Sequence, residues 1–231
     1  MKIVKTDCIV LKKREIREAD LQVTLFSKEY GKIMATAYGI RKSQKRNIVS
    51  LNPLNEVEIM LFQKNNYYVI KDVEIIKNFK NILKNIEKLE IALYVLDSID
   101  KIYYTANENG NFFNKLVEIL SFIDTLPYVK KGYKYYVVLS FLRRIMIEQG
   151  IYDIEEIISI LINEKKENKK KYKEVMETLR TSSDIFEIQD RFEEYTNFVK
   201  KMVIIFENFI NKNLQVELKI KKFIMEEFYG D

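Results

Sequence analysis

The sequence predicts an α+β protein with two domains, a small five-stranded barrel followed by an all-α domain. The apolar residues alternate with a strand-like period through the first 76 residues and then take up a helical period. Positive charge follows the same division, because residues 1–76 hold 14 Lys and Arg against 9 Asp and Glu, whereas residues 77–231 hold 25 of each. We therefore expect domains at 1–77 and 78–231, with the N-terminal one facing phosphates or acidic lipid.

Five strand-like segments account for the expected barrel. The clearest is the fourth, in which Val57, Ile59 and Leu61 alternate with Glu56, Glu58 and Met60. Five short strands in so short a stretch are typical of the OB architecture, a barrel that often binds single-stranded nucleic acid. Other small barrel folds are also compatible with these strands. The five segments are 3–14, 21–25, 33–38, 57–61 and 67–76.

The second part of the chain reads as a series of helices. Gly150 is placed to end one of them and Asp153 to cap the next. The charged run 164–174 is most often a solvated helix or loop, and a binding role for it is the alternative. The expected helices cover 87–104, 112–123, 131–149, a segment after Asp153, a segment starting at Ser183 or Asp184, 195–212 and 217–228.

The longest connection between strands, from Gly39 to Leu54, is the main candidate site. It carries four cations in six residues, with Tyr38 at its base. Such a loop suits the phosphates of a nucleic acid, although a solvated basic loop has the same composition. Tyr38, Tyr67 and Tyr68 could stack on bases or could simply pack the barrel. The four cations are Arg41, Lys42, Lys45 and Arg46, and a second basic cluster, Lys12, Lys13 and Arg14, closes the first strand.

The residue inventory argues against an enzyme, a metal site or a membrane protein. The chain has one cysteine and no histidine, which excludes an intrachain disulfide, a His/Cys metal site and a Ser-His-Asp arrangement. We expect Cys8 to be a buried, inert thiol. Glu18 and Asp20 are expected to satisfy backbone donors in a turn rather than to act as a catalytic pair. Without a signal peptide or a long apolar run, a cytoplasmic location without a membrane partner is expected.

Several motifs together resemble one family, the bacterial RecO recombination mediators. The resemblance covers most of the chain and is weakest over 151–195. It rests on these segments: Glu18-Ala-Asp20, Thr24-Leu-Phe-Ser27, Gly31-Lys-Ile33, Gly39-Ile-Arg-Lys42, Leu51-Asn-Pro53, Leu142–Gly150, and Phe206, Phe209, Ile210, Leu218-Lys219 and Phe223 near the C-terminus.

The resemblance implies a non-enzymatic DNA repair and recombination mediator in the cytoplasm, associated with the nucleoid and without cofactors. Such proteins bind single- and double-stranded DNA and anneal complementary strands. They act with RecR, often with RecF, to load RecA onto DNA coated with single-strand-binding protein. The family's Gly-Lys turn falls on Gly31-Lys32 and its basic segment on Arg41-Lys42. Together with the charge pattern this gives the expected DNA-binding residues Lys12, Lys13, Arg14, Lys32, Tyr38, Arg41, Lys42, Lys45 and Arg46.

Two departures from the family pattern matter. Many members carry a four-cysteine zinc module in the region corresponding to 151–180, and this chain has no cysteine there, so no zinc module is expected. The family's Leu-Lys-Ser near the C-terminus is Leu218-Lys219-Ile220 here.

The family also implies that the helical domain receives the acidic C-terminal tail of single-strand-binding protein. That tail needs an apolar pocket and a cation for its carboxylate. The alternative is that Arg143 and Arg144 only stabilise a helix dipole. Two other functions stay open, an OB-fold RNA-binding protein and a helical adaptor without nucleic-acid binding. The expected tail-binding residues are Lys134, Tyr135, Leu139, Leu142, Arg143 and Arg144.

Overall fold

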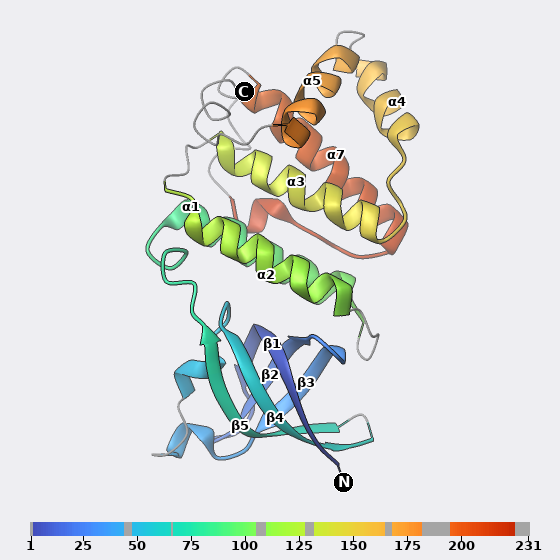
Figure 1. Ribbon diagram of the computed structural model, residues 1–231. Coiled ribbons are helices and arrows are strands. Elements are labelled where there is room, and N and C mark those ends of the chain that lie inside the picture. Colours follow the sequence, from blue (N-terminus) through green and yellow to red (C-terminus); the bar gives the residue numbers. More distant parts are fainter. Residues whose placement is uncertain are drawn as a thin grey trace. The chain divides into compact units, whose positions relative to one another are not determined.

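The computed structural model describes residues 2–43, 48–65, 67–104, 110–127, 132–164, 168–181 and 195–224 (Figure 1). The chain forms two compact units, Met1–Leu126 and Pro127–Asp231, which are described separately below. All the described strands lie in the first unit, together with helices α1 and α2, and the second unit is helical. The expected α+β class is therefore confirmed.

The position expected for the domain boundary marks a change of secondary structure rather than the end of the first compact unit. Strand β5 ends at Lys77 and α1 begins at Ile86, but the unit continues to Leu126. The division of the chain into domains 1–77 and 78–231 stays a prediction.

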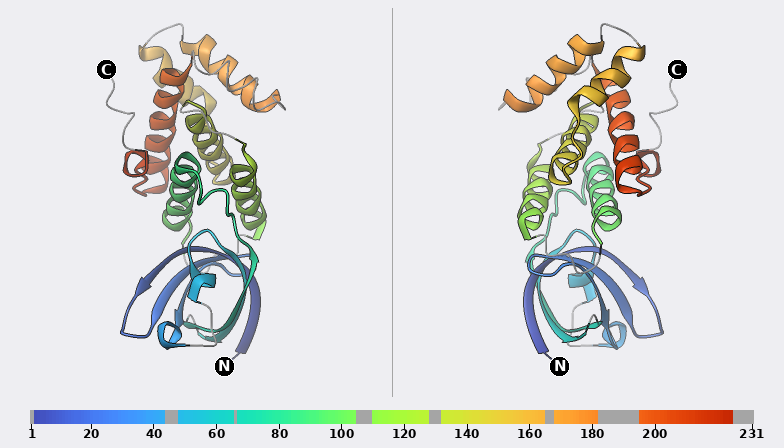
Figure 2. Two further views of the ribbon diagram at one scale, coloured as in Figure 1. Left: turned by 90° about the vertical axis from the view of Figure 1, so that its left-hand side faces the viewer. Right: turned by 90° about the vertical axis from the view of Figure 1, so that its right-hand side faces the viewer.

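The strands close into a barrel, which Figure 2 shows from two sides. Their order around the barrel is β1-β2-β3-β5-β4. All neighbouring strands are antiparallel except β3 and β5, which run parallel and pair through Ala35 with Tyr68 and Thr36 with Val69. The closure leaves no free sheet edge along the paired stretches. The strands are β1 (Lys2–Glu15), β2 (Leu21–Ser27), β3 (Gly31–Ala37), β4 (Glu56–Lys64) and β5 (Tyr67–Lys77).

The barrel forms because alternate residues of each strand are apolar and point inward. Val57, Ile59 and Leu61 of β4 are fully buried, as their spacing predicts. Cys8 lies in the same core and is a free thiol, which confirms the expectation that it is buried. Gly31 permits the β2–β3 turn because its φ of 60° lies in the left-handed region.

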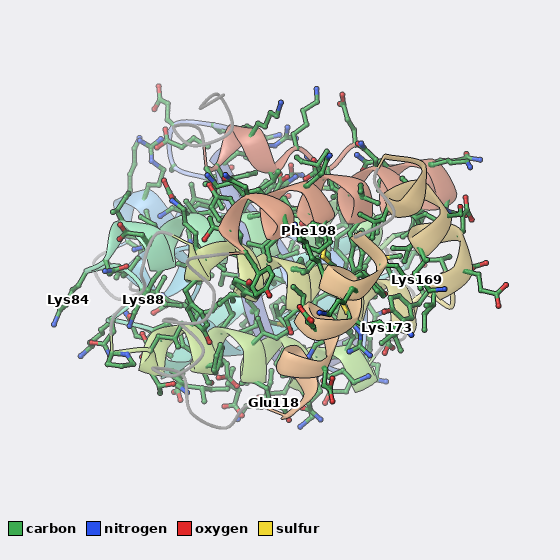
Figure 3. The ribbon with its side chains drawn as sticks, turned by 90° about the horizontal axis from the view of Figure 1, so that it is seen from above. Lys84, Lys88, Glu118, Lys169, Lys173 and Phe198 are labelled. Atoms are coloured by element: carbon green, nitrogen blue, oxygen red, sulfur yellow. The ribbon has the colours of Figure 1, made fainter. Side chains whose placement is uncertain are left out.

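Helices α1 (Ile86–Ile102) and α2 (Gly110–Thr125) complete the first unit. The Asn85 side chain caps α1 by accepting a hydrogen bond from the backbone N–H of Lys88 at 2.9 Å. The Tyr103 ring lies 5.1 Å from Phe26 of β2 and 5.2 Å from Phe112 of α2, so one aromatic cluster joins the barrel to both helices. The exposed Lys84 and the buried Lys88 are labelled in Figure 3.

In the second unit α3 packs against α7. Gly150 ends α3 with a φ of 67°, and the two hydrogen bonds from Gly150 and Ile151 to the last turn form a Schellman motif. Asp153 caps α4 because its Oδ1 accepts hydrogen bonds from the backbone N–H groups of Glu155 and Glu156. Both caps were predicted. The described helices are α3 (Tyr133–Glu148), α4 (Ile154–Glu164), α5 (Asn168–Thr181) and α7 (Thr196–Leu214).

Two further expectations concern the charged run 164–174 and the helix expected over 217–228. Part of the run is in α5, from which Lys169 and Lys173 project (Figure 3). The helix expected over 217–228 is wrong where the structure describes it, because only Ile220–Lys222 forms a short 3-10 helix. The helix expected from Ser183 or Asp184 lies outside the described residues, as do residues 225–231.

Side chains of α7 explain why the segment after it is extended. The Asn211 amide accepts a hydrogen bond from the Leu218 N–H at 2.7 Å and donates one to the Leu218 carbonyl at 3.0 Å. The Glu207 carboxylate accepts the Ile220 N–H at 2.7 Å. The chain reverses at Gln215, whose φ is 54°, so residues 216–219 run back along α7 instead of extending it.

Candidate nucleic-acid interface

Two connections of the barrel are joined by hydrogen bonds, the β1–β2 turn at residues 16–20 and the segment that follows β3. The Asp20 carboxylate accepts the backbone N–H of Gly39 at 2.7 Å. The backbone N–H of Arg41 donates to the Ala19 carbonyl at 3.1 Å. Gly39 has a φ of 64° and precedes a 3-10 helix, Ile40–Lys42, that carries two of the expected cations. Asp20 thus satisfies a backbone donor, as its place in a turn predicted.

The cations of these connections sit beside carboxylates of the β1–β2 turn. Arg41 Nη1 lies 2.8 Å from Glu15 Oε2 and donates to the Glu18 carbonyl at 3.1 Å, while Lys42 Nζ lies 3.1 Å from Glu18 Oε2. Arg17 Nη1 lies 3.9 Å from Asp20 Oδ2. Exposed pairs of this kind contribute at most about 1 kcal/mol each. A phosphate can therefore take the place of a glutamate at small cost.

The three cations expected on β1 have different environments. Arg14 is exposed, and its Nε donates to Gln22 Oε1 of β2 at 2.6 Å. Lys13 is half-buried and donates to Asn52 Oδ1 at 2.5 Å. Lys12 is exposed and forms an ion pair with Asp100 of α1. The structure therefore brings Arg14 near the β1–β2 turn but directs Lys12 towards the helix.

Lys32 lies where α1 meets the barrel. Its side chain is 15% exposed, its Nζ lies 3.6 Å from Asp100 Oδ1, and it also donates to the Asp100 carbonyl. Burial lowers the pKa of Lys32, and the charge of Asp100 opposes that shift. This geometry favours a structural link between β3 and α1. The assignment of Lys32 to DNA stays a prediction.

The three tyrosines divide between the surface and the core. Tyr38 and Tyr67 are exposed and hydrogen-bonded to each other through their hydroxyls. Tyr68 is 8% exposed and receives a hydrogen bond from the Gln63 amide at 3.1 Å, so it is part of the barrel packing. Lys45 and Arg46, the remaining candidates of the basic loop, lie outside the described residues.

The expected tail-binding residues of α3 do not form an open apolar surface. Tyr135, Leu139 and Leu142 are fully buried in the described structure. Lys134 is buried too, with its Nζ 5.8 Å from the centre of the Tyr135 ring. The Arg143 guanidinium lies 5.3 Å from the centre of the Tyr152 ring, and Arg144 is exposed. Only the arginines of the set are accessible for an acidic ligand.

Two observations on the described residues concern metal ligands and the single thiol. No group of three or more His, Cys, Asp or Glu residues among them could hold a metal ion. Burial raises the pKa of the Cys8 thiol, which keeps it protonated and unreactive. In the part of the chain that the structure describes, no helix is long and apolar enough to span a bilayer.

A closed barrel with the strand order β1-β2-β3-β5-β4 and an exposed cationic end belongs to the OB-fold class, whose members often bind single-stranded nucleic acid. Residues 1–79 match the family described as "Recombination protein O N terminal". This match shows that the first third of the chain is similar to the N-terminal domain of the RecO family, as the resemblance of its motifs indicated.

Curated proteins with the same family name are similar to about half of this chain. The chain is 37% identical over 117 residues to a protein named "DNA repair protein RecO" of Caldanaerobacter subterraneus subsp. tengcongensis, covering 50% of this chain and 47% of the relative. It is 36% identical over 126 residues to one of Thermoanaerobacter sp., covering 54% and 51%. A protein of Clostridium perfringens with the same name is 27% identical over 125 residues, covering 54% and 51%. Each match thus spans about half the length of the relative.

Proposed function

We propose that this protein is a non-enzymatic DNA repair and recombination mediator that acts in the cytoplasm at the nucleoid. It binds single- and double-stranded DNA and anneals complementary strands. With RecR, it helps load RecA onto DNA coated with single-strand-binding protein. The similarity of residues 1–79 to the RecO N-terminal domain, and of about half of the chain to proteins named "DNA repair protein RecO", supports the role in DNA repair.

The observation that carries the proposal is the fixed position of Arg41 beside the β1–β2 turn. The Asp20–Gly39 hydrogen bond and the Arg41–Ala19 backbone bond hold the 3-10 helix at the end of the barrel. Arg41 and Lys42 are thereby kept close to Glu15 and Glu18. Lys45 and Arg46 follow within the same connection and extend its positive charge. Phosphates in place of the two glutamates would neutralise this cluster.

Annealing follows from such a site without bond chemistry. Two DNA strands repel each other through their phosphates, and bound cations reduce that repulsion. Because contacts to phosphates leave the Watson–Crick edges free, a bound strand can still pair with its complement. Arginine adds a planar fork for phosphate, while lysine adds a point charge. The site therefore needs exposed cations rather than a deep pocket.

The test is an annealing assay with two complementary DNA oligonucleotides, one labelled with a donor dye and the other with an acceptor. The protein should accelerate annealing, and a variant with Ala at Arg41, Lys42, Lys45 and Arg46 should lose most of the effect. The same assay with RNA strands separates a mediator from an RNA-binding protein. A folded wild-type protein that binds neither DNA nor RNA at low salt would instead support the adaptor function.

The partner assignment rests on different residues. We propose that the helical unit binds the acidic C-terminal tail of single-strand-binding protein through Arg143 and Arg144. Arg144 is exposed, and Arg143 retains hydrogen-bonding groups while its guanidinium lies over Tyr152. Tyr135, Leu139 and Leu142 would contribute to a pocket only if α3 opened, because they are buried.

A further inference from the structure

Two large aromatic side chains are exposed side by side at the end of the barrel. Tyr38 follows the last residue of β3 and Tyr67 is the first residue of β5, two strands that pair in parallel. Tyr38 is 41% exposed and Tyr67 is 50% exposed, and their hydroxyls form a hydrogen bond with each other. The bond holds the two rings as one unit on the outside of the barrel.

Barrel packing does not account for this pair. Tyr68, the neighbour of Tyr67, points the other way and is in the barrel core. The alternation of β5 therefore assigns the packing role to Tyr68 and leaves Tyr67 outside. An exposed phenol that is fixed by a neighbour presents a flat apolar face at little further entropic cost, which is what stacking on a base requires.

Cations lie next to the tyrosine pair. Arg17 Nη1 lies 3.9 Å from Asp20 Oδ2, and the Asp20 carboxylate accepts the backbone N–H of Gly39, the residue that follows Tyr38. The Arg17 side chain is 74% exposed. Arg14 pairs with Gln22, and Gln22 pairs in register with Thr36, two residues before Tyr38. Phosphates on either side of a stacked base would meet these arginines.

Helix α1 limits where a DNA strand can cross the outer face formed by strands β1, β2 and β3. Phe26 pairs in register with Lys32, and both are covered by α1 through Tyr103 and Asp100. The row that contains Gln22 and Thr36 lies further along these strands, towards the tyrosine pair. Outside the covered part, Met34 of β3 and Tyr38 are exposed on this outer face, so the accessible surface includes the part beside Tyr38 and Tyr67.

We propose that Tyr38 and Tyr67 form a stacking site for the unpaired bases of single-stranded DNA, with Arg14 and Arg17 binding the flanking phosphates. The inference rests on the proposed function, in which the barrel binds DNA. In a duplex the faces of internal bases are covered by their neighbours, so this site favours single strands, whereas the Arg41–Lys42 cluster binds the backbone of either form.

The test measures binding by fluorescence anisotropy with three labelled ligands of equal length. These are a single strand, a strand of abasic residues with the same number of phosphates, and a duplex. The wild-type protein should bind the ordinary strand at least about 5- to 150-fold more tightly than the abasic strand, which is the range expected for one stacked base. Equal binding of the two strands would overturn the stacking site while leaving backbone binding intact. Failure to bind any ligand would overturn the proposed function itself.

Variants separate stacking from charge and from folding. Tyr38→Ala and Tyr67→Ala should lower the affinity for the ordinary strand towards that of the abasic strand without changing the salt slope, since no cation is lost. Tyr38→Phe and Tyr67→Phe keep the rings and should retain most of the preference. Tyr104→Ala removes an exposed tyrosine beyond α1 and should have no effect. Unchanged binding by a folded Tyr38→Ala/Tyr67→Ala protein would contradict the proposal.

Discussion

The carboxylate of Asp20 accepts a hydrogen bond from the backbone N–H of Gly39, with 2.7 Å between Oδ1 and N. These residues are 19 positions apart in the chain and join the β1–β2 turn to the end of β3. The bond spans the base of the connection that carries the main DNA-binding candidates. Its effect should therefore be visible in both stability and DNA binding.

Asp20→Ala should lower the free energy of unfolding by about 1–3 kcal/mol, the usual cost of losing a hydrogen bond to a charged group. It should also weaken single-strand binding, because the 3-10 helix with Arg41 loses its anchor. Urea denaturation and anisotropy titrations measure the two effects. Asp20→Asn keeps an oxygen acceptor and should retain most of the binding. Equal losses of binding by both variants would mean that the charge of Asp20 matters and its hydrogen bond does not.

Replacement of Arg41 and Lys42 by alanine should weaken DNA binding in a salt-dependent way. Each lost phosphate contact lowers the slope of log affinity against log salt by roughly 0.7 on single strands, so the double variant should lose roughly 1.4. Lys169→Ala/Lys173→Ala is the matched control, because it removes the same charge from α5. If both double variants lose the same slope, the effect comes from net charge and not from the barrel site.

Asp100→Asn should destabilise the first unit by about 1–3 kcal/mol, because Lys32 would keep a poorly hydrated charge without its partner. Lys12→Ala removes the exposed ion pair to the same carboxylate and should cost less than about 1 kcal/mol. Urea unfolding of the two variants gives the comparison. A larger effect for Lys12→Ala would show that the exposed pair, rather than the half-buried one, links the barrel to α1.

Because the Cys8 thiol is buried, we expect the folded protein to lose stability at alkaline pH. Burial raises the pKa of its thiol in the folded protein, whereas an unfolded chain ionises near pH 8.5. The free energy of unfolding is therefore unaffected by the thiol below that pH. Above it the free energy of unfolding falls by up to about 1.4 kcal/mol per pH unit, because only the unfolded chain ionises. Wild type and Cys8→Ala should differ in the pH dependence of urea unfolding between pH 7 and 10. A thiol reagent should modify Cys8 only as fast as the barrel opens, and rapid modification at pH 7 would contradict this.

Binding of the acidic tail should depend on the arginines at the end of α3. A peptide that corresponds to the C-terminal tail of single-strand-binding protein should bind in the micromolar range, at about −8 kcal/mol. Arg144→Glu should weaken binding by about tenfold or more while leaving DNA annealing unchanged. Lys169→Glu is the control for charge reversal on another helix. Calorimetric titration that gives the same affinity for wild type and Arg144→Glu would place the tail site elsewhere.

The barrel could be predicted because its information is local. Alternation of apolar residues defined each strand, and the inward positions of β4 match that pattern. The same reasoning failed after Gln215, since the hydrogen bonds of Asn211 and Glu207 with the returning segment outweigh its helical pattern. Side-chain contacts between distant parts of the chain carry no periodic signal.

The site was only partly accessible to sequence reasoning for the same reason. Charge clustering identified Arg41 and Lys42, but nothing in the spacing indicated that Lys32 pairs with a residue 68 positions away. The distinction between Tyr67 and Tyr68 needed the register of β5. The pocket expected on α3 stays a prediction, but its apolar residues belong to a nearly continuous apolar run, which is typical of a helix buried on most sides.

The aromatic contact between Phe26 and Tyr103 has a practical consequence for dissecting this protein. A fragment that stops at Lys77 would leave an uncovered phenylalanine and an unpaired Lys32 on the outside of the barrel. Such a surface favours aggregation, and an apparent lack of activity in that fragment would then reflect its solubility. A fragment that continues to Leu126 keeps Tyr103 and Asp100, the partners of Phe26 and Lys32. It is therefore the shorter fragment of the whole chain that suits biochemical work.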